Sequence, residues 1–201
     1  GRTNSGPMVG PVVISEIMYH PPDLAGGIDD VANEFIELRN TTGSAVPLFD
    51  PANPPNTWRL KDAVSFNFPA RMNIPANGTI LVVSFNTNDT ATLNAFRTKY
   101  SVAAGAVILG PYSGKLDNSS ESVELARPDS PETAGPDAGL VPYILVDKVK
   151  YFDTTPWPLG TDGAGQSLTR TTPANYGNDP VNWVAATPTM VRRPGCRVHA
   201  A

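Results

Sequence analysis

Histidines, cysteines and paired carboxylates are the side chains from which transfer or hydrolytic chemistry would be built, and this chain has few of them. It has two histidines, His20 and His199, and one cysteine, Cys196. Nucleophilic catalysis needs a histidine that packing holds beside its nucleophile. Cys196 and His199 lie near the chain end, where order is usually low, and His20 precedes Pro21 in a pattern typical of a turn. The sequence therefore predicts no nucleophilic catalyst.

Carboxylates three residues apart form two pairs in the sequence: Glu34 with Glu37, and Glu121 with Glu124. Acid/base catalysis of the glycosidase kind requires two carboxyl groups that converge on one bond. Residues three apart in a strand point to opposite faces, so neither pair can converge from its own strand. We expect a structural role instead, such as a cross-strand salt bridge from Glu37 to Lys148 or Lys150.

Two acidic loops are the candidate metal sites. Calcium prefers several oxygen ligands, which loops rich in Asp, Asn and backbone carbonyls supply. Neither loop matches the EF-hand pattern, and Asp-Gly is also a common turn dipeptide without any metal. We expect no cofactor, and the alternative is a calcium ion held by aspartates of these loops: Asp23, Asp29, Asp30, Asp162 and Asp179.

Three aromatic residues beside turn residues are the candidate ligand-binding residues. Tyr112 follows Gly110-Pro111, Trp157 lies between two prolines, and Trp183 follows Asn182. Together they could form a platform for sugars or peptides. The alternative is that they close the end of the domain, which aromatic residues flanked by proline often do.

The elements that would position these side chains are mostly strands. Short runs rich in β-branched and aromatic residues alternate with clusters of Gly, Pro, Asn and Asp. In residues 34–40, Ile36 and Leu38 share one face, while Phe35, Glu37 and Arg39 share the other, which we expect to be partly wet. The sequence predicts strands at 12–19, 34–40, 57–60, 64–68, 79–85, 106–109, 122–126, 144–151 and 167–170.

One helix interrupts the strand pattern. Leu93, Phe96 and Tyr100 recur at helical spacing after Asp89, which can cap the first turn. This spacing predicts a short helix between residues 89 and 101, which we expect to close one end of the fold. The continuous apolar run at 80–83 predicts a strand that is covered on both faces. The expected core residues are Phe35 or Ile36, Leu38, Trp58, Leu60, Leu81, Val83, Val123 and Leu125.

Composition limits the domain organisation and the partners. The chain has 201 residues, a net charge of -4 and no basic run, which argues against nucleic-acid binding. No stretch reaches the about 18 apolar residues of a membrane span. The pattern favours one domain at residues 11–187, with linkers at 1–10 and 188–201 and surface loops at 47–56 and 127–142.

Several segments in order resemble the lamin tail domain family, particularly its version in large exported bacterial proteins. They cover roughly residues 12 to 186, and their order and spacing carry the resemblance. The segments are ISEIMY at 14–19, NEFIELRN at 33–40, WRL at 58–60 with FP at 68–69 and IPANG at 74–78, LDNSSESVEL at 116–125, and VDKVKY at 146–151.

The resemblance implies an all-β fold, an immunoglobulin-like antiparallel β-sandwich, without the antibody-type disulfide because the chain has one cysteine. The heptads that precede this domain in nuclear lamins are absent from the chain. The resemblance therefore suggests a non-catalytic structural or interaction module of an exported bacterial protein, located extracellularly or at the cell envelope. Its partners would be neighbouring domains of the parent chain, a protein or a glycan. The alternative is a calcium-dependent accessory domain of a secreted hydrolase or nuclease.

Overall fold

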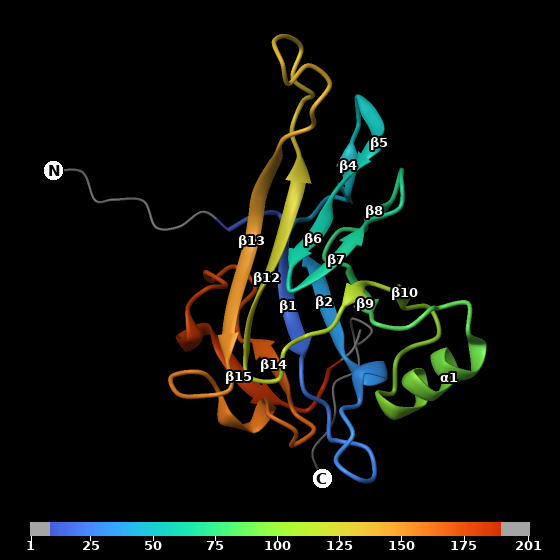
Figure 1. Ribbon diagram of the computed structural model, residues 1–201, viewed down its shortest axis with the longest axis vertical. Helices are drawn as coiled ribbons and strands as arrows, with labels where there is room; N and C mark the ends of the chain where they lie inside the picture. Colours follow the sequence, from blue (N-terminus) through green and yellow to red (C-terminus); the bar gives the residue numbers. More distant parts are fainter. Residues whose placement is uncertain (1–8, 190–201) are drawn as a thin grey trace, which may run out of the picture.

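The computed structural model describes residues 9–189 and confirms the expected antiparallel β-sandwich (Figure 1). Most of the two predicted linkers, 1–10 and 188–201, lies outside the described residues, as do Cys196 and His199. Two sheets face each other across an apolar core, and two short strand pairs extend the fold. None of the helices in residues 9–189 combines the length and the apolar composition that are needed to cross a membrane.

The larger sheet has six strands in the order β10-β9-β2-β1-β14-β15. Its neighbouring strands are antiparallel, except that β10 runs parallel to β9. Aliphatic and β-branched runs form most of these strands, because such side chains pack well on a pleated surface. The strands are β1 (Val12–Met18), β2 (Phe35–Asn40), β9 (Thr79–Val83), β10 (Val107–Leu109), β14 (Ser167–Arg170) and β15 (Trp183–Ala186).

The second sheet has five strands in the order β11-β7-β6-β12-β13. They are β6 (Arg59–Asp62), β7 (Val64–Asn67), β11 (Ser113–Gly114), β12 (Ser120–Pro128) and β13 (Tyr143–Phe152). Two short pairs join β3 (Val46–Pro47) to β8 (Asn73–Ile74), and β4 (Phe49–Asp50) to β5 (Asn53–Thr57). The helices are α1 (Thr90–Lys99) and three 3-10 turns, η1 (Val31–Asn33), η2 (Leu159–Thr161) and η3 (Pro180–Asn182).

Each predicted strand has a counterpart in the structure; β14 has the predicted ends, and the ends of the others are shifted. Two predictions about the rest of the chain were incomplete. The stretch 47–56 contains β4 and most of β5, so it is a short hairpin and not only a loop. The sequence also missed β3, β8, β11 and β15, because these strands are only two to four residues long.

The main core lies between the two sheets, and a smaller core lies on the outer face of the larger sheet. Strand β9 contributes to both, because successive side chains alternate between faces. Ile80 and Val82 point into the main core, and Leu81 and Val83 into the smaller one. All the expected core residues are buried, which confirms them. The outer face of β2 is partly exposed, as expected, but only at Arg39, because Phe35 and Glu37 are buried.

Helix α1 covers that outer face. Asp89 caps it as expected, with its carboxylate accepting hydrogen bonds from the amides of Ala91 and Thr92. Phe96 then packs edge-to-face against Phe35, with ring centroids 6.2 Å apart. The helix therefore closes a face of the larger sheet and not an end of the sandwich, because its apolar residues meet Phe35, Leu81 and Val83 there.

A projecting hairpin distinguishes one end of the molecule. Strands β12 and β13 continue past the body of the sandwich, and residues 129–142 form the tip, at the top of Figure 1. The β4–β5 hairpin rises beside it in the same view, and both β4 and β5 contact β12. The two hairpins thus stand together at the same end of the sandwich.

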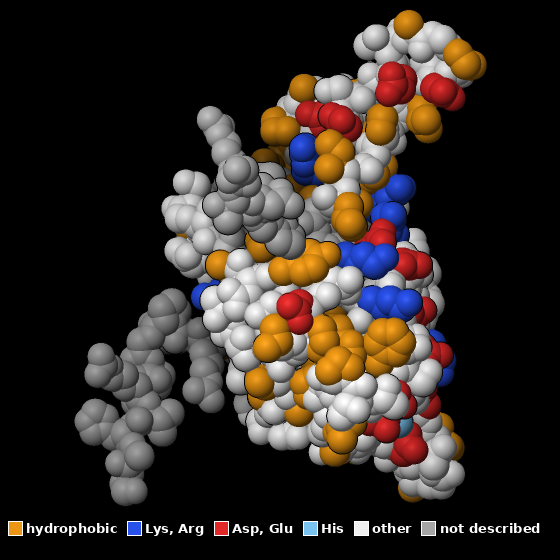
Figure 2. Space-filling model, turned by 90° about the vertical axis from the view of Figure 1, so that its left-hand side faces the viewer, with side chains coloured by type: hydrophobic (Ala, Val, Ile, Leu, Met, Phe, Trp, Pro, Cys, Tyr) orange, Lys and Arg blue, Asp and Glu red, His pale blue; other side chains and the backbone are white. Residues whose placement is uncertain are grey.

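The edge of the sandwich near β13 and β15 carries apolar surface. Figure 2 looks onto this side and shows apolar side chains gathered in its lower half. Exposed apolar side chains come from β15 and from the turns beside it: Leu159, Tyr176, Val181 and Val184.

Candidate functional site

His20 and three of the aspartates proposed as metal ligands come together at one end of β1. His20 forms an isolated bridge with Asp162, and its Nδ1 lies 2.5 Å from the Asp162 carboxylate. Its Nε2 lies 3.4 Å from Asp23. Burial lowers the pKa of His20, but the hydrogen bonds with Asp162 and Asp23 outweigh it, so the pKa is raised overall. A carboxylate on Nδ1 is the arrangement that orients a metal-binding imidazole.

Asp29 completes this group. One ligand atom each from His20, Asp23 and Asp29 lies within 4.8 Å of the others. Asp29 Oδ2 pairs with Lys115 Nζ at 2.9 Å, and Asp29 Oδ1 is shielded from solvent without a hydrogen-bond partner among the described residues. The donor set is one nitrogen and two carboxylates, with a lysine competing for one of the carboxylates.

The other two predicted aspartates lie elsewhere. Asp30 pairs with Lys99 at 2.9 Å and accepts from Asn33. Asp179 caps η3 by accepting from the Val181 amide. From the sequence alone, His20 was predicted only as a turn residue. The signal that could have indicated a site is Asp23, which follows His20 by three positions.

The three aromatic residues proposed as a platform are core residues. Tyr112, Trp157 and Trp183 are each at most 5% exposed. Trp157 packs against Trp183, and the Trp183 indole nitrogen donates to the Gly177 carbonyl at 2.7 Å. Their rings are packed in the main core and therefore offer no open face for a sugar.

Glu34 is a fully buried carboxyl group directly before β2. Its Oε2 accepts from the Tyr112 hydroxyl at 2.6 Å and from the Leu116 amide at 2.9 Å. Burial, with a smaller contribution from nearby Asp29, raises the pKa of Glu34 to about 7, and the two hydrogen bonds and Lys115 limit this rise. Its Oε1 is buried without a partner among the described residues.

The carboxylate pairs do not converge on a common point. The Glu124 carboxylate pairs with Lys61 Nζ at 2.6 Å and with Lys148 Nζ at 2.8 Å. Lys148, one of the two lysines expected to pair with Glu37, therefore pairs with Glu124. Glu37 accepts from the Ser15 hydroxyl at 2.7 Å. These contacts support the structural role that the spacing predicted.

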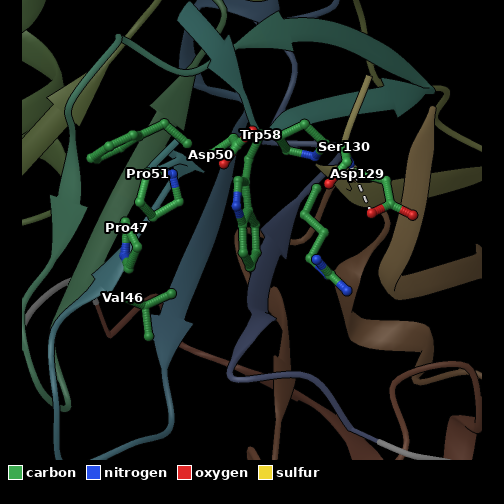
Figure 3. Close-up of a pocket in the computed structure, with 10 residues that line it drawn as sticks. Val46, Pro47, Asp50, Pro51, Trp58, Asp129 and Ser130 are labelled. Carbon is green, nitrogen blue, oxygen red and sulfur yellow. Dashed lines mark hydrogen bonds between the residues drawn. The ribbon is translucent and has the colours of Figure 1, made fainter. Parts of the chain in front are cut away.

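A pocket of about 280 Å³ opens between the two hairpins at the projecting end (Figure 3). Trp58 stands at its centre, held by backbone hydrogen bonds from its amide to Leu48 and to its carbonyl from Phe68. The sequence predicted Trp58 only as a core residue, because nothing local places the two hairpins beside it. The lining consists of Val46, Pro47, Phe49, Asp50, Pro51, Trp58, Arg127, Pro128, Asp129 and Ser130.

The Trp58 side chain is 5% exposed, and its indole nitrogen donates to no described residue. Unlike the unpaired Asp29 Oδ1 and Glu34 Oε1, this nitrogen is not shielded from solvent. A ligand in the pocket can therefore reach it. Figure 3 shows it on the side of the ring where Pro47 and Pro51 lie. The pocket thus combines proline and aromatic walls with charged side chains and with an indole N–H that has no acceptor among the described residues.

Comparison with known proteins identifies one family. The family model described as Lamin Tail Domain matches residues 6–136. This segment begins before β1 and ends within the tip of the β12–β13 hairpin. No curated protein matches the chain.

Proposed function

The chain belongs to the lamin tail domain family, and from this premise we propose that it is a non-catalytic interaction module of a larger exported bacterial protein. The family consists of immunoglobulin-like domains, and the two-sheet sandwich agrees with that fold. Function has to be argued from a site and not from the fold alone. The observation that carries the proposal is the pocket at Trp58, where a nearly buried indole keeps a free donor.

The proposed setting is extracellular or at the cell envelope. The partners are neighbouring domains of the parent chain, or a protein or glycan bound at the projecting end. Two features support a binding role: the hairpins form a walled pocket, and apolar side chains such as Val181 and Val184 are exposed around β15. Exposed apolar surface of this kind commonly marks contacts with other proteins or domains.

Binding at the pocket is tested by nuclear magnetic resonance of the domain labelled with ¹⁵N. Panels of peptides and of oligosaccharides are added while the indole resonance of Trp58 is followed. We expect at least one class to shift this resonance and to bind less tightly to Trp58→Phe than to the control variant Asp153→Asn, which lies outside the pocket lining. If neither class shifts it, the proposed binding role at this pocket is wrong.

A cation-dependent accessory domain of a secreted hydrolase or nuclease is the second candidate. The specific observation in its favour is the convergence of His20, Asp23 and Asp29, with Asp162 on the far ring nitrogen. The sequence suggested calcium here, but an imidazole ligand suits zinc better. The test therefore uses both ions.

Isothermal titration of the chelator-treated protein with calcium and with zinc distinguishes the two candidates. Binding of one equivalent of either ion would favour the accessory domain if two conditions hold. Asp23→Asn should bind the ion at least tenfold more weakly than the wild type, and Asp179→Asn should bind it equally well. The absence of binding heat with both ions would exclude a cation site at His20. Asp179 is the matched control because it loses the same charge outside the His20 group.

We predict no hydrolytic turnover on ester, peptide, glycoside or phosphodiester substrates, with or without divalent metal. Such reactions need a positioned base or metal, and the carboxylate pairs do not converge. A substrate screen measures this. Turnover that requires metal and disappears in Asp29→Asn and Asp162→Asn would contradict the non-enzymatic proposal.

A further inference from the structure

The side chains that line the pocket between the β4–β5 and β12–β13 hairpins favour some classes of ligand over others. Its one buried polar group is the indole nitrogen of Trp58, which has no acceptor among the described residues. An indole N–H without a protein acceptor favours a ligand that brings a carbonyl oxygen to it, because the nearly buried side chain leaves this donor little access to water.

The walls favour an extended peptide over a sugar. Only 5% of the Trp58 side chain is exposed, so its ring face is not open for stacking on a pyranose. The neighbouring walls are Pro47, Pro51, Pro128 and Phe49. Proline and aromatic walls suit proline-rich segments, which are pre-organised in the polyproline II conformation and leave their carbonyls free of internal hydrogen bonds.

The charges around the pocket favour a basic ligand. Asp50 and Asp129 line it together with one cation, Arg127. Hydrogen bonds from the Asn53 side chain and the Ala52 amide lower the pKa of Asp50, so this group stays anionic. Acidic side chains continue along the projecting hairpin, which Figure 2 shows at the top, where Glu132 and Asp137 are exposed.

The hairpins that form the pocket are held in place. The Tyr143 hydroxyl, at the start of β13, donates to the Thr57 carbonyl at 3.2 Å. The guanidinium of Arg59 lies 3.5 Å from the centroid of the Tyr143 ring. A pre-formed pocket loses less conformational entropy on binding than one that must first assemble.

From these observations we propose that the pocket binds an extended, proline-containing peptide segment that carries a basic side chain. A peptide carbonyl oxygen accepts a hydrogen bond from the Trp58 N–H, the prolines pack against Pro47, Pro51 and Phe49, and the basic group lies near Asp129. This inference rests on the proposed function, because it names the partner class of the same pocket.

The test is isothermal titration with three synthetic peptides. The first is Arg-Pro-Leu-Pro-Pro-Leu-Pro, the second has Glu in place of Arg, and the third has Ala in place of every Pro. We expect the first to bind best. Trp58→Phe keeps an aromatic side chain, although a smaller one, and removes the donor, so it should weaken binding about tenfold. Asp129→Asn should weaken it about threefold and reduce the effect of added salt.

Asp153→Asn is the matched control. It removes the same charge just beyond the other end of β13, and we expect unchanged affinity. Thermal unfolding shows whether each variant is folded. Asn at position 129 keeps the oxygen that accepts from the Ser130 amide, so this substitution preserves the local turn.

Other outcomes overturn the inference in distinguishable ways. Equal binding of all three peptides, or binding that Trp58→Phe leaves unchanged, contradicts it. An oligosaccharide that shifts the Trp58 resonance when no peptide does contradicts it but retains the interaction module. If neither class of ligand binds at Trp58, both the inference and the proposed binding role fail.

Discussion

At the scale of a single residue, the Glu34 side chain bonds to residues that are distant from it in the sequence. It precedes β2 of the larger sheet, and its partners Tyr112 and Leu116 lie on either side of β11, an edge strand of the smaller sheet. A buried carboxylate costs free energy unless hydrogen bonds compensate for the lost water. Here two hydrogen bonds compensate only in part, and the pKa rises to about 7. Protonation of this one group therefore affects the stability of the fold near neutral pH.

We expect Glu34→Gln to reduce the dependence of stability on pH. The pKa of Glu34 is raised from 4.5 to about 7 on folding, so its stabilising contribution is complete below pH 4.5 and is lost as the pH rises through 7. Relative to the variant, the free energy of unfolding of the wild type should fall by on the order of 3 kcal/mol between about pH 5 and 8. Urea denaturation at both pH values measures it.

Glu132→Gln is the control, because it removes one carboxylate from the exposed hairpin tip. The difference between this variant and the wild type should stay nearly constant. A constant difference for Glu34→Gln as well would show that Glu34 is not the group that titrates.

At the scale of the elements, a buried ion pair fastens the two sheets together. Asp147 belongs to β13 in the smaller sheet and Arg170 to β14 in the larger one, and their side chains meet at 2.7 Å. The same carboxylate accepts from the Ile14 amide of β1, and the Arg170 guanidinium donates to the carbonyls of Ile14 and Asn175. Burial raises the pKa of Asp147, although Arg170 opposes the rise.

Asp147→Asn should destabilise the domain by about 3–5 kcal/mol, because it leaves the Arg170 cation buried without its counterion. Removing that cation as well, in Asp147→Asn/Arg170→Met, should recover part of the loss. Chemical denaturation of the wild type, both single variants and the double variant measures the coupling. Additive losses would contradict a direct interaction across the sheets.

At the scale of the whole molecule, the larger sheet is covered on both faces in its central part. One face meets the smaller sheet and the other meets α1. Strand β1 is buried along its whole length for this reason, although it carries Ser15 and Glu16. The stability of the domain therefore depends chiefly on the central strands.

Leu38→Ala should test this dependence. Leu38 is fully buried in the main core, and such truncations cost about 2–5 kcal/mol. For a domain of this size, the melting temperature should fall on the order of 10 °C. Val181→Ala, at an exposed turn, should change it little. A melting temperature that Leu38→Ala leaves unchanged would contradict the register of β2.

The sequence by itself determined the longer strands, the α-helix at 90–99 and the core residues. These follow from local periodicity: alternation places Leu38 and Leu60 inside, and Asp89 caps the helix through neighbouring amides. The family was also evident from short segments such as NEFIELRN, because their order along the chain does not depend on tertiary contacts.

Only the tertiary structure decided what the side chains contact. His20 and Asp162 are far apart in sequence yet form one group, and Glu34 meets Tyr112 only when β2 packs beside the crossing segment. Trp58 is a core residue both by prediction and in the structure. Whether its indole nitrogen faces a pocket depends on the positions of two hairpins that are distant in the sequence. Periodicity reports which face a residue occupies, whereas the partner on that face is set by non-local strand pairing and packing.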